Sequence, residues 1–255
     1  MSPTPLLHAR GVTKRFDGIR ALDDVAVSVE AGECVGLIGP NGAGKTTLFD
    51  CLTGRLALDA GAVRFRGRGL DGLSGTARAR LGLARTFQRI ELFSGMTVAD
   101  HLLVAALAHG GRPRLWRDVL GRGRPTPADR ERVEAILDML GLTATADRPV
   151  EALTLGQARL VELGRALACE PVLLFLDEPS SGLDRSEAHA MATVLEHVRD
   201  HSGVAILLVE HDVPLVRRLA TRLYVLDLGR LVADGPTDEV LSHPEVRAAY
   251  LGAGA

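Results

Sequence analysis

A glycine-rich segment in the first fifth of the chain has the residue types and spacing of a phosphate-binding loop. It fits the pattern GxxxxGK[ST], and its residues, with the threonine that follows, are Gly39, Pro40, Asn41, Gly42, Ala43, Gly44, Lys45, Thr46 and Thr47. Small residues in such a loop let backbone N–H groups surround phosphate oxygens at a helix N-terminus. Lys45 is predicted to bind the β- and γ-phosphates, and Thr46 to bind Mg²⁺. The alternative is a plain glycine-rich turn, which is disfavoured because Lys45 is one of only two lysines in the chain.

Two adjacent carboxylates follow a later apolar run. Asp177 and Glu178 come directly after Val172–Leu176, which is apolar throughout. Such a run is typical of a parallel strand buried on both faces, whose carboxyl end is where open α/β sheets bind ligands. Asp177 is predicted to bind Mg²⁺, directly or through water, and Glu178 to accept a proton from the attacking water or to polarise it. Alone, the pair is also compatible with a solvated strand end; with the phosphate loop it indicates a nucleotide hydrolase.

The hydrophobic pattern predicts strands on both sides of these motifs. Near the start, Val25, Val27 and Val29 alternate with small residues, which predicts a strand with one exposed face. The runs Val172–Leu176 and Val204–Val209 predict two parallel strands, joined by a crossover helix over about residues 186–200. The predicted core is therefore of the α/β class.

A different period marks a helical block inserted within this core, at roughly residues 89–169. Apolar residues at helical spacing predict one helix that starts at Thr126 and Pro127 and stops at Gly141. A second helix is predicted around Leu160, Leu163 and Leu167. No internal repeat is found.

Composition bounds the class of protein. The chain has 255 residues, 46% of them hydrophobic, and a net charge of −2, so it can bury a core and is not held to nucleic acid by bulk charge. Its three cysteines are widely spaced, which fits a reducing compartment. No apolar run approaches the ~18–20 residues of a spanning helix, and the N-terminus does not read as a signal peptide. We expect a cytosolic protein that reaches a membrane through a partner.

Seven segments carry a resemblance to a known family. The chain resembles the ATP-binding subunits of ABC transporters over essentially its whole length, and the segments, in order, are Phe16, Gly39–Thr47, Gln88, Leu153–Gln157, Leu173–Glu178, Ser181–Asp184 and His211. The resemblance implies an α/β P-loop NTPase fold with a parallel core sheet, an antiparallel β-subdomain near residues 6–66 and a helical subdomain. It implies a single ATP-binding domain over residues 1–255, with 1–88 and 170–255 as nucleotide-binding core and 89–169 as helical signature subdomain.

The resemblance also implies roles for single residues. Phe16 would stack on adenine; the alternative is a core aromatic. Gln88 would sense Mg²⁺, as a ligand beside Thr46 and Asp177, and couple the site to the permease. His211 would contact the γ-phosphate and join Glu178 and Gln88 as the catalytic residues; taken alone, it reads as a satisfied strand-end histidine. The cofactors implied are ATP and Mg²⁺.

The signature segment departs from the usual LSGGQ of the family. It consists of Leu153, Thr154, Leu155, Gly156 and Gln157, in which leucine replaces the first glycine. A side chain there would restrict backbone approach to the nucleotide. In the family this segment acts on the ATP of a second subunit, so two copies close head to tail. Further dimer contacts are implied for Ser181, Gly182, Leu183 and Asp184.

The subfamily implied is that of the ATPases of branched-chain or other hydrophobic amino acid importers. The segments that carry this likeness are Ala84–Gln88, Gly235–Leu241 and His243–Gly252. The expected partners are membrane permease subunits, a second ATPase subunit that is identical or a paralogue, and, indirectly, an extracytoplasmic substrate-binding protein, with no nucleic acid. The expected location is the cytoplasmic face of the cell membrane.

Several alternatives stay open at this point. The same C-terminal pattern is similar to that of urea-importer ATPases and of the lipopolysaccharide-export ATPase. Two rivals from other classes are a soluble ABC ATPase without a transport role and a small-molecule kinase. An arginine-rich stretch, Gly110–Arg124, is interpreted as a solvated loop or short surface helix, and alternatively as a contact with the permease or lipid head groups.

Overall fold

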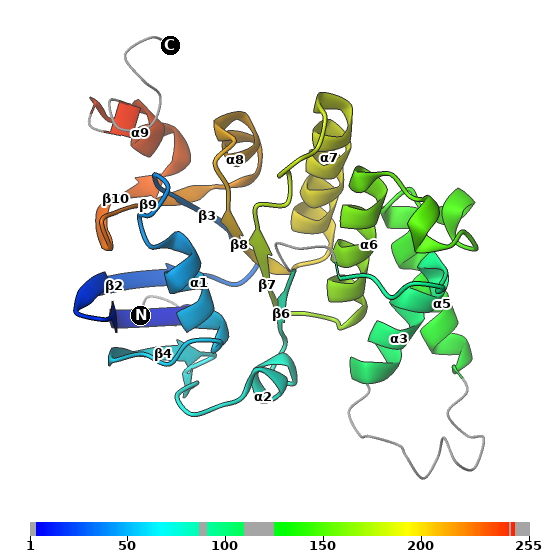
Figure 1. The fold of residues 1–255 in the computed structure, drawn as a ribbon, viewed down its shortest axis with the longest axis horizontal. Coiled ribbons are helices and arrows are strands. Elements are labelled where there is room, and N and C mark those ends of the chain that lie inside the picture. Colours follow the sequence, from blue (N-terminus) through cyan, green and yellow to red (C-terminus); the bar gives the residue numbers. More distant parts are fainter. Residues whose placement is uncertain (1–3, 87–90, 110–124, 245, 248–255) are drawn as a thin grey trace.

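A six-stranded sheet forms the centre of the molecule (Figure 1). The computed structural model describes residues 4–86, 91–109, 125–244 and 246–247. In spatial order the sheet contains β10 (Arg230–Pro236), β9 (Arg222–Asp227), β3 (Cys34–Ile38), β8 (Ala205–Val209), β7 (Leu173–Asp177) and β6 (Leu83–Arg85). All neighbours pair in parallel except β10, which is antiparallel to β9. The α/β prediction is confirmed.

Both faces of the central strands β3, β8 and β7 are buried, as the continuous apolar runs predict. In β7, Leu173 and Phe175 face one hydrophobic cluster, whereas Leu174 and Leu176 face another. The first cluster includes helix α1 (Lys45–Thr53), and the second includes helix α7 (Arg185–His201). Because α7 connects β7 to the parallel strand β8, it is the predicted crossover.

A four-stranded antiparallel sheet lies on the α1 side of this core (Figure 1). Its order is β2 (Ile19–Val29), β1 (Leu7–Phe16), β4 (Ala60–Phe65) and β5 (Arg68–Gly69). Val25, Val27 and Val29 are buried while Ala26 is exposed, so the predicted half-exposed strand is confirmed. Short helix α2 (Gly75–Ala79) then leads to β6.

Among the described residues, three helices pack beside the β6 edge of the central sheet (Figure 1). They are α3 (Val98–His109), α5 (Pro127–Met139) and α6 (Leu155–Ala168), with two 3₁₀ turns, η1 (Thr143–Thr145) and η2 (Val150–Ala152). Helix α5 starts as predicted, because Thr126 caps it reciprocally with Asp129 and Pro127 occupies its first turn. Gly141 lies just beyond its end with φ +66°. The arginine-rich stretch 110–124 falls outside the described residues.

Helices α8 (Val213–Leu219) and α9 (Thr237–Ser242) complete the fold against β9 and β10. They share a small apolar cluster with Ile38, Leu223 and Val225. Within the described residues, no helix is long and apolar enough to cross a bilayer.

Candidate nucleotide-hydrolysis site

The glycine-rich loop joins the buried strand β3 to helix α1, in the strand–loop–helix order that the motif requires. Gly44 is the residue before α1 and has φ +103°. A Cβ atom there would lie 2.7 Å from the carbonyl oxygen of Ala21. Conformation and close packing therefore both require glycine at position 44.

Lys45 is folded back into the loop. Its ammonium donates to the carbonyl oxygens of Gly39 and, at 3.0 Å, of Pro40, and the residue is only 8% exposed. Burial lowers the pKa of Lys45, while the negative charges of Glu178 and Asp177 oppose that change. The predicted phosphate-binding lysine and the predicted acidic pair thus lie in one electrostatic environment.

Asp177 is the last residue of β7 and is almost fully buried, with 2% exposure. Its Oδ2 accepts a hydrogen bond of 3.1 Å from Arg85 at the end of β6. Burial raises the pKa of Asp177, and the Arg85 guanidinium opposes this rise. The prediction that this carboxylate stands at the carboxyl edge of a buried parallel strand is confirmed.

Glu178 adopts a left-handed backbone conformation with φ +47°, which is uncommon for a residue with a side chain. Its N–H donates to the carbonyl of Val209 at 2.8 Å, so the neighbouring strand β8 holds this turn in place. Backbone strain of this kind is concentrated at functional sites.

Phe16 lies at the tip of the β1–β2 hairpin and is 43% exposed. The Lys14 ammonium is 5.5 Å from the centroid of its ring. The alternative of a core aromatic is wrong for this residue; stacking on adenine stays a prediction.

His211 follows β8, and its side chain is 62% exposed. The residue before it, Glu210, is fully buried and was not singled out in the sequence. The Glu210 carboxylate accepts hydrogen bonds from the Ser180 hydroxyl at 2.6 Å and from the His211 N–H at 2.9 Å. It therefore connects the turn after Glu178 to the turn that carries His211.

The signature segment forms the start of helix α6. Thr154 caps the helix, and its hydroxyl accepts from the Gln157 N–H at 3.2 Å. The Gly156 N–H donates to Glu187 of α7 at 3.1 Å, and a Cβ at position 156 would meet the Glu187 side chain at 2.8 Å. Leu155 is 41% exposed. The structure thus connects the signature to the helix that follows Ser181–Asp184, a contact that sequence reasoning missed.

The site residues fall into two groups in this chain. The loop Gly39–Thr47 and the pair Asp177 and Glu178 come together at one edge of the sheet. The signature residues instead form hydrogen bonds at the start of α6, between Thr154 and Gln157, and from Gly156 to Glu187 of α7. Gln88 lies outside the described residues.

A phosphate loop before a helix, with an acidic pair at the end of a neighbouring buried strand, defines a nucleoside triphosphate hydrolase of the P-loop class. Residues 22–181 match the ABC transporter family, and residues 230–255 match the family described as branched-chain amino acid ATP-binding cassette transporter. The chain belongs to the ABC transporter family and is an ATPase of that family.

Relatives and solved structures agree with this assignment. The high-affinity branched-chain amino acid transport ATP-binding protein LivG of Salmonella typhimurium is 38% identical over 97% of this chain and 98% of its own length. BraF of Pseudomonas aeruginosa, with the same description, has the same identity and coverage. A nucleotide-free ATP-binding cassette from an ABC transporter superposes with a TM-score of 0.82 at 31% identity, over 97% of this chain and 99% of that one.

Proposed function

We propose that this chain is the ATP-hydrolysing subunit of an importer of branched-chain or other hydrophobic amino acids. The observation that carries the chemistry is the meeting of Lys45 with Asp177 and Glu178 at one sheet edge. The names of LivG and BraF, together with the match of residues 230–255, support the substrate class. Urea import and lipopolysaccharide-type export are the alternatives within the family.

Each part of ATP has a proposed partner in this site. Phe16 stacks on adenine, and the backbone of Gly39–Thr47 surrounds the phosphates, with Lys45 at the β- and γ-phosphates. Glu178 accepts a proton from the attacking water, and His211 contacts the γ-phosphate. The exposed ring of Phe16 and the exposed imidazole of His211 support these roles, because both are accessible to a ligand.

The donor set at the site fits Mg²⁺. The Thr46 hydroxyl and the Asp177 carboxylate are hard oxygen donors, which Mg²⁺ prefers. Thr46 adjoins Lys45, whose ammonium is near enough to Asp177 to be affected by its charge. We propose that Thr46 and Asp177, with Gln88, hold this ion, which supplies neutralisation of phosphate charge.

Hydrolysis is proposed to require two subunits arranged head to tail. The exposed start of helix α6, with Thr154 and Leu155 on the surface, supports a role in binding the ATP of a second copy or paralogue. A helix N-terminus favours anions such as a γ-phosphate. Ser181–Asp184 would complete the dimer contact, and residues 89–169 would form the helical subdomain that presents Leu153–Gln157.

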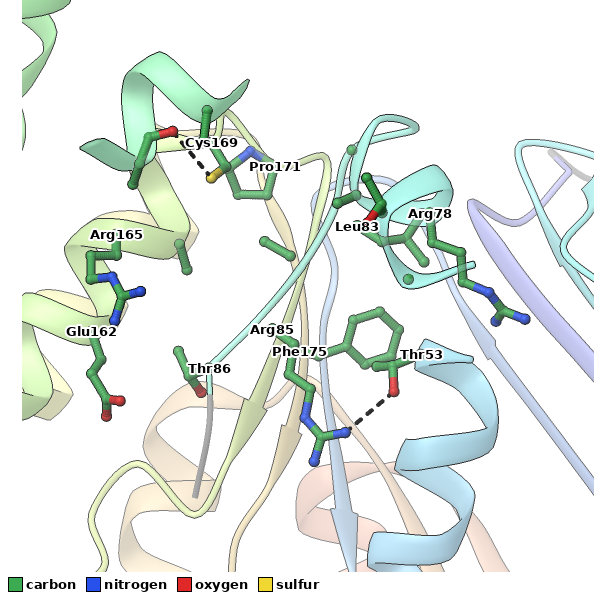
Figure 2. Close-up of a pocket in the computed structure, with 18 of the residues that line it drawn as sticks. Thr53, Arg78, Leu83, Arg85, Thr86, Glu162, Arg165, Cys169, Pro171 and Phe175 are labelled. Carbon is green, nitrogen blue, oxygen red and sulfur yellow. Dashed lines mark hydrogen bonds between the residues drawn. The ribbon is translucent and has the colours of Figure 1, made fainter. Parts of the chain in front are cut away.

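The permease is proposed to dock in a pocket of about 860 Å³ between helix α2 and helices α3 and α6 (Figure 2). Apolar side chains line it, including Phe93 and Val104, both about half exposed. Five arginines and a single glutamate also line it: Arg55, Arg78, Arg80, Arg85, Arg165 and Glu162. This pocket suits a helical permease segment with apolar and acidic side chains. Such docking would place the chain at the cytoplasmic face of the membrane, with the extracytoplasmic binding protein as an indirect partner.

The test is ATP-driven uptake by the complex. The chain is co-expressed with a candidate permease pair, reconstituted in proteoliposomes, and supplied with a candidate binding protein and labelled leucine or urea. We expect leucine uptake that depends on ATP and is lost in Lys45→Ala. Uptake of urea alone, movement of solute in the opposite direction, or failure of the chain to associate with any permease would contradict the proposal.

A further inference from the structure

The Arg85 side chain joins the two elements that carry the proposed metal ligands. Its Nη1 contacts Asp50 and lies 3.3 Å from the Thr53 hydroxyl, both in helix α1 (Figure 2 shows the Thr53 contact). Its Nη2 donates to Oδ2 of Asp177 at 3.1 Å. A single guanidinium therefore connects α1, which begins at Lys45 and Thr46, to the end of β7.

The Arg85 guanidinium that makes this connection is buried, and its plane is fixed by its neighbours. The side chains of Arg85 and Asp177 are 11% and 2% exposed, and that of Asp50 is 20% exposed. The Arg85 guanidinium also lies over the Phe49 ring, with 4.8 Å between its central carbon and the ring centroid. A planar guanidinium that stacks on a ring and contacts two carboxylates has little freedom to turn. Its contact with Oδ2 consequently orients the second oxygen of Asp177.

Packing alone does not account for arginine at this position. Within the part of the chain that the structure describes, Nε of Arg85 is buried without a hydrogen-bond partner. An unpaired buried donor is unfavourable, but an apolar side chain here would leave the buried Asp177 carboxylate without its partner. Arginine at the end of β6 is therefore accounted for by its contacts with the two carboxylates, which fix the position of Asp177 relative to α1.

We propose that Arg85 is a positioning residue for the metal: it holds the Asp177 carboxylate in register with Thr46 on helix α1. This inference rests on the proposed role of Asp177 and Thr46 as metal ligands. Without Arg85, Asp177 is free to turn, so the ATP complex binds the divalent ion more weakly. Binding of ATP without metal is unchanged, because neither the proposed adenine contact nor the phosphate loop includes Arg85.

The experiment separates binding of the metal from binding of the nucleotide. Mn²⁺ affinity of the ATP complex is measured by electron paramagnetic resonance, in a Glu178→Gln background that prevents turnover, and ATP affinity is measured by calorimetry in EDTA. Arg85→Met is expected to weaken Mn²⁺ binding by about tenfold or more, the usual effect of losing an outer-shell partner. Arg85→Lys should give a smaller loss, because an ammonium cannot hold both carboxylates.

Arg55→Met is the matched control. The Arg55 side chain is 58% exposed, its Nε lies 4.0 Å from the same Asp50 carboxylate, and it lines the same pocket as Arg85. Removing it takes a similar charge from the same neighbourhood, and we expect Mn²⁺ affinity to stay unchanged.

Three results would overturn the inference. They are unchanged Mn²⁺ affinity in folded Arg85→Met, an equal loss of ATP affinity in EDTA, and an equal Mn²⁺ loss in Arg55→Met. If Arg85→Met does not fold, the Mn²⁺ affinity of Arg85→Lys is measured in its place, and an unchanged affinity in that variant would also overturn the inference. Asp177→Asn identifies which proposal fails: if it too leaves Mn²⁺ affinity unchanged, the metal site itself is wrong, and if it alone weakens binding, only the role of Arg85 is wrong.

Discussion

In the proposed site, the charged Lys45 ammonium is held by contacts that a bound nucleotide would replace. Lys45 donates to two carbonyl oxygens of its own loop, and the carboxylates of Asp177 and Glu178 are close enough to affect its pKa. In the proposed complex, Lys45 would exchange the loop carbonyls for phosphate oxygens, which are stronger acceptors because they are charged. The proposed phosphate-binding cation therefore lies inside the loop that would surround the phosphates.

The first prediction at this scale concerns Lys45. Lys45→Ala should remove most of the ATP affinity, since a charged hydrogen bond is worth about 1.5–3 kcal/mol, or roughly ten- to a hundredfold in binding. Calorimetry measures the loss, and the thermal unfolding midpoint confirms that the variant is folded. Near-normal ATP binding by a folded variant would count against the phosphate-loop assignment.

Glu178 is expected to separate binding from hydrolysis. Glu178→Gln should bind ATP and Mg²⁺ but lose about 10²–10⁴-fold in turnover, because an amide cannot accept the proton of water. Closed dimers should then accumulate with ATP on gel filtration, whereas Glu239→Gln, at an exposed position in α9, should behave as wild type. Monomer alone, for both Glu178→Gln and wild type, would mean that closure needs the permease or does not occur.

Glu210 is predicted to matter for stability. Glu210→Ala leaves the half-buried Ser180 hydroxyl and the His211 N–H without their shared acceptor, which should lower the free energy of unfolding by about 1–3 kcal/mol. Glu210→Gln keeps an oxygen acceptor and should cost less. Urea denaturation of both variants measures the difference, and equal unfolding midpoints for Glu210→Ala and wild type would refute this account.

At the scale of elements, the start of the signature helix α6 contacts the crossover helix α7 and the segment before it. The Gly156 N–H donates to Glu187, and a Cβ at Gly182 would lie 3.2 Å from the Leu155 side chain. The side chain of Leu155 thus extends along its own subunit toward the segment Ser181–Asp184. This contact explains how a leucine is accommodated where the family commonly has glycine.

Replacing Leu155 by glycine tests whether its side chain limits turnover. Leu155→Gly should leave ATP affinity of the single subunit unchanged, because the proposed nucleotide contacts lie elsewhere in the chain. Turnover should change by less than about threefold, since the flexibility that glycine adds at a helix start, about 0.5–1 kcal/mol, opposes the relief of a steric limit. A large gain in steady-state turnover would show that Leu155 acts as a brake. A large change in monomer ATP affinity would contradict the head-to-tail arrangement.

What the sequence predicts here depends on how local the cause is. The sequence predicts a feature well when the residues that cause it are neighbours in the chain. This holds for the loop Gly39–Thr47, the cap at Thr126 and the buried run Val172–Leu176. The roles of Arg85 and Glu210 cannot be predicted in this way. Their partners Asp177 and Ser180 are distant in sequence, so their importance appears only once β6, β7 and β8 are side by side.

At the scale of the whole molecule, the reactivity of the cysteines tests whether a bound permease covers the proposed docking pocket. Burial raises the pKa of Cys34 to about 12 and that of Cys51 to about 11, so both thiols stay protonated and inaccessible near neutral pH. Cys169 is only partly buried and lines the proposed docking pocket, and its pKa is also raised by burial.

Maleimide should therefore modify Cys169 first, slowly at pH 7 and faster as pH rises, because the raised pKa keeps the thiolate fraction small. Bound permease should slow this reaction, as measured by mass spectrometry of the intact protein. Cys169→Ser should abolish modification of the folded chain. Equal rates with and without permease would place docking elsewhere.

The position of β3 in the central sheet has a consequence for how this protein is made. The strand that leads into the phosphate loop lies between β8 and β9, which follow it in the chain by about 170 residues or more. At about 5–20 residues per second, a ribosome needs on the order of ten to thirty seconds to supply those neighbours. During that interval the apolar strand and its loop have no sheet to join. The sheet that positions the phosphate loop therefore cannot form until β8 and β9, both in the last fifth of the chain, have been synthesised.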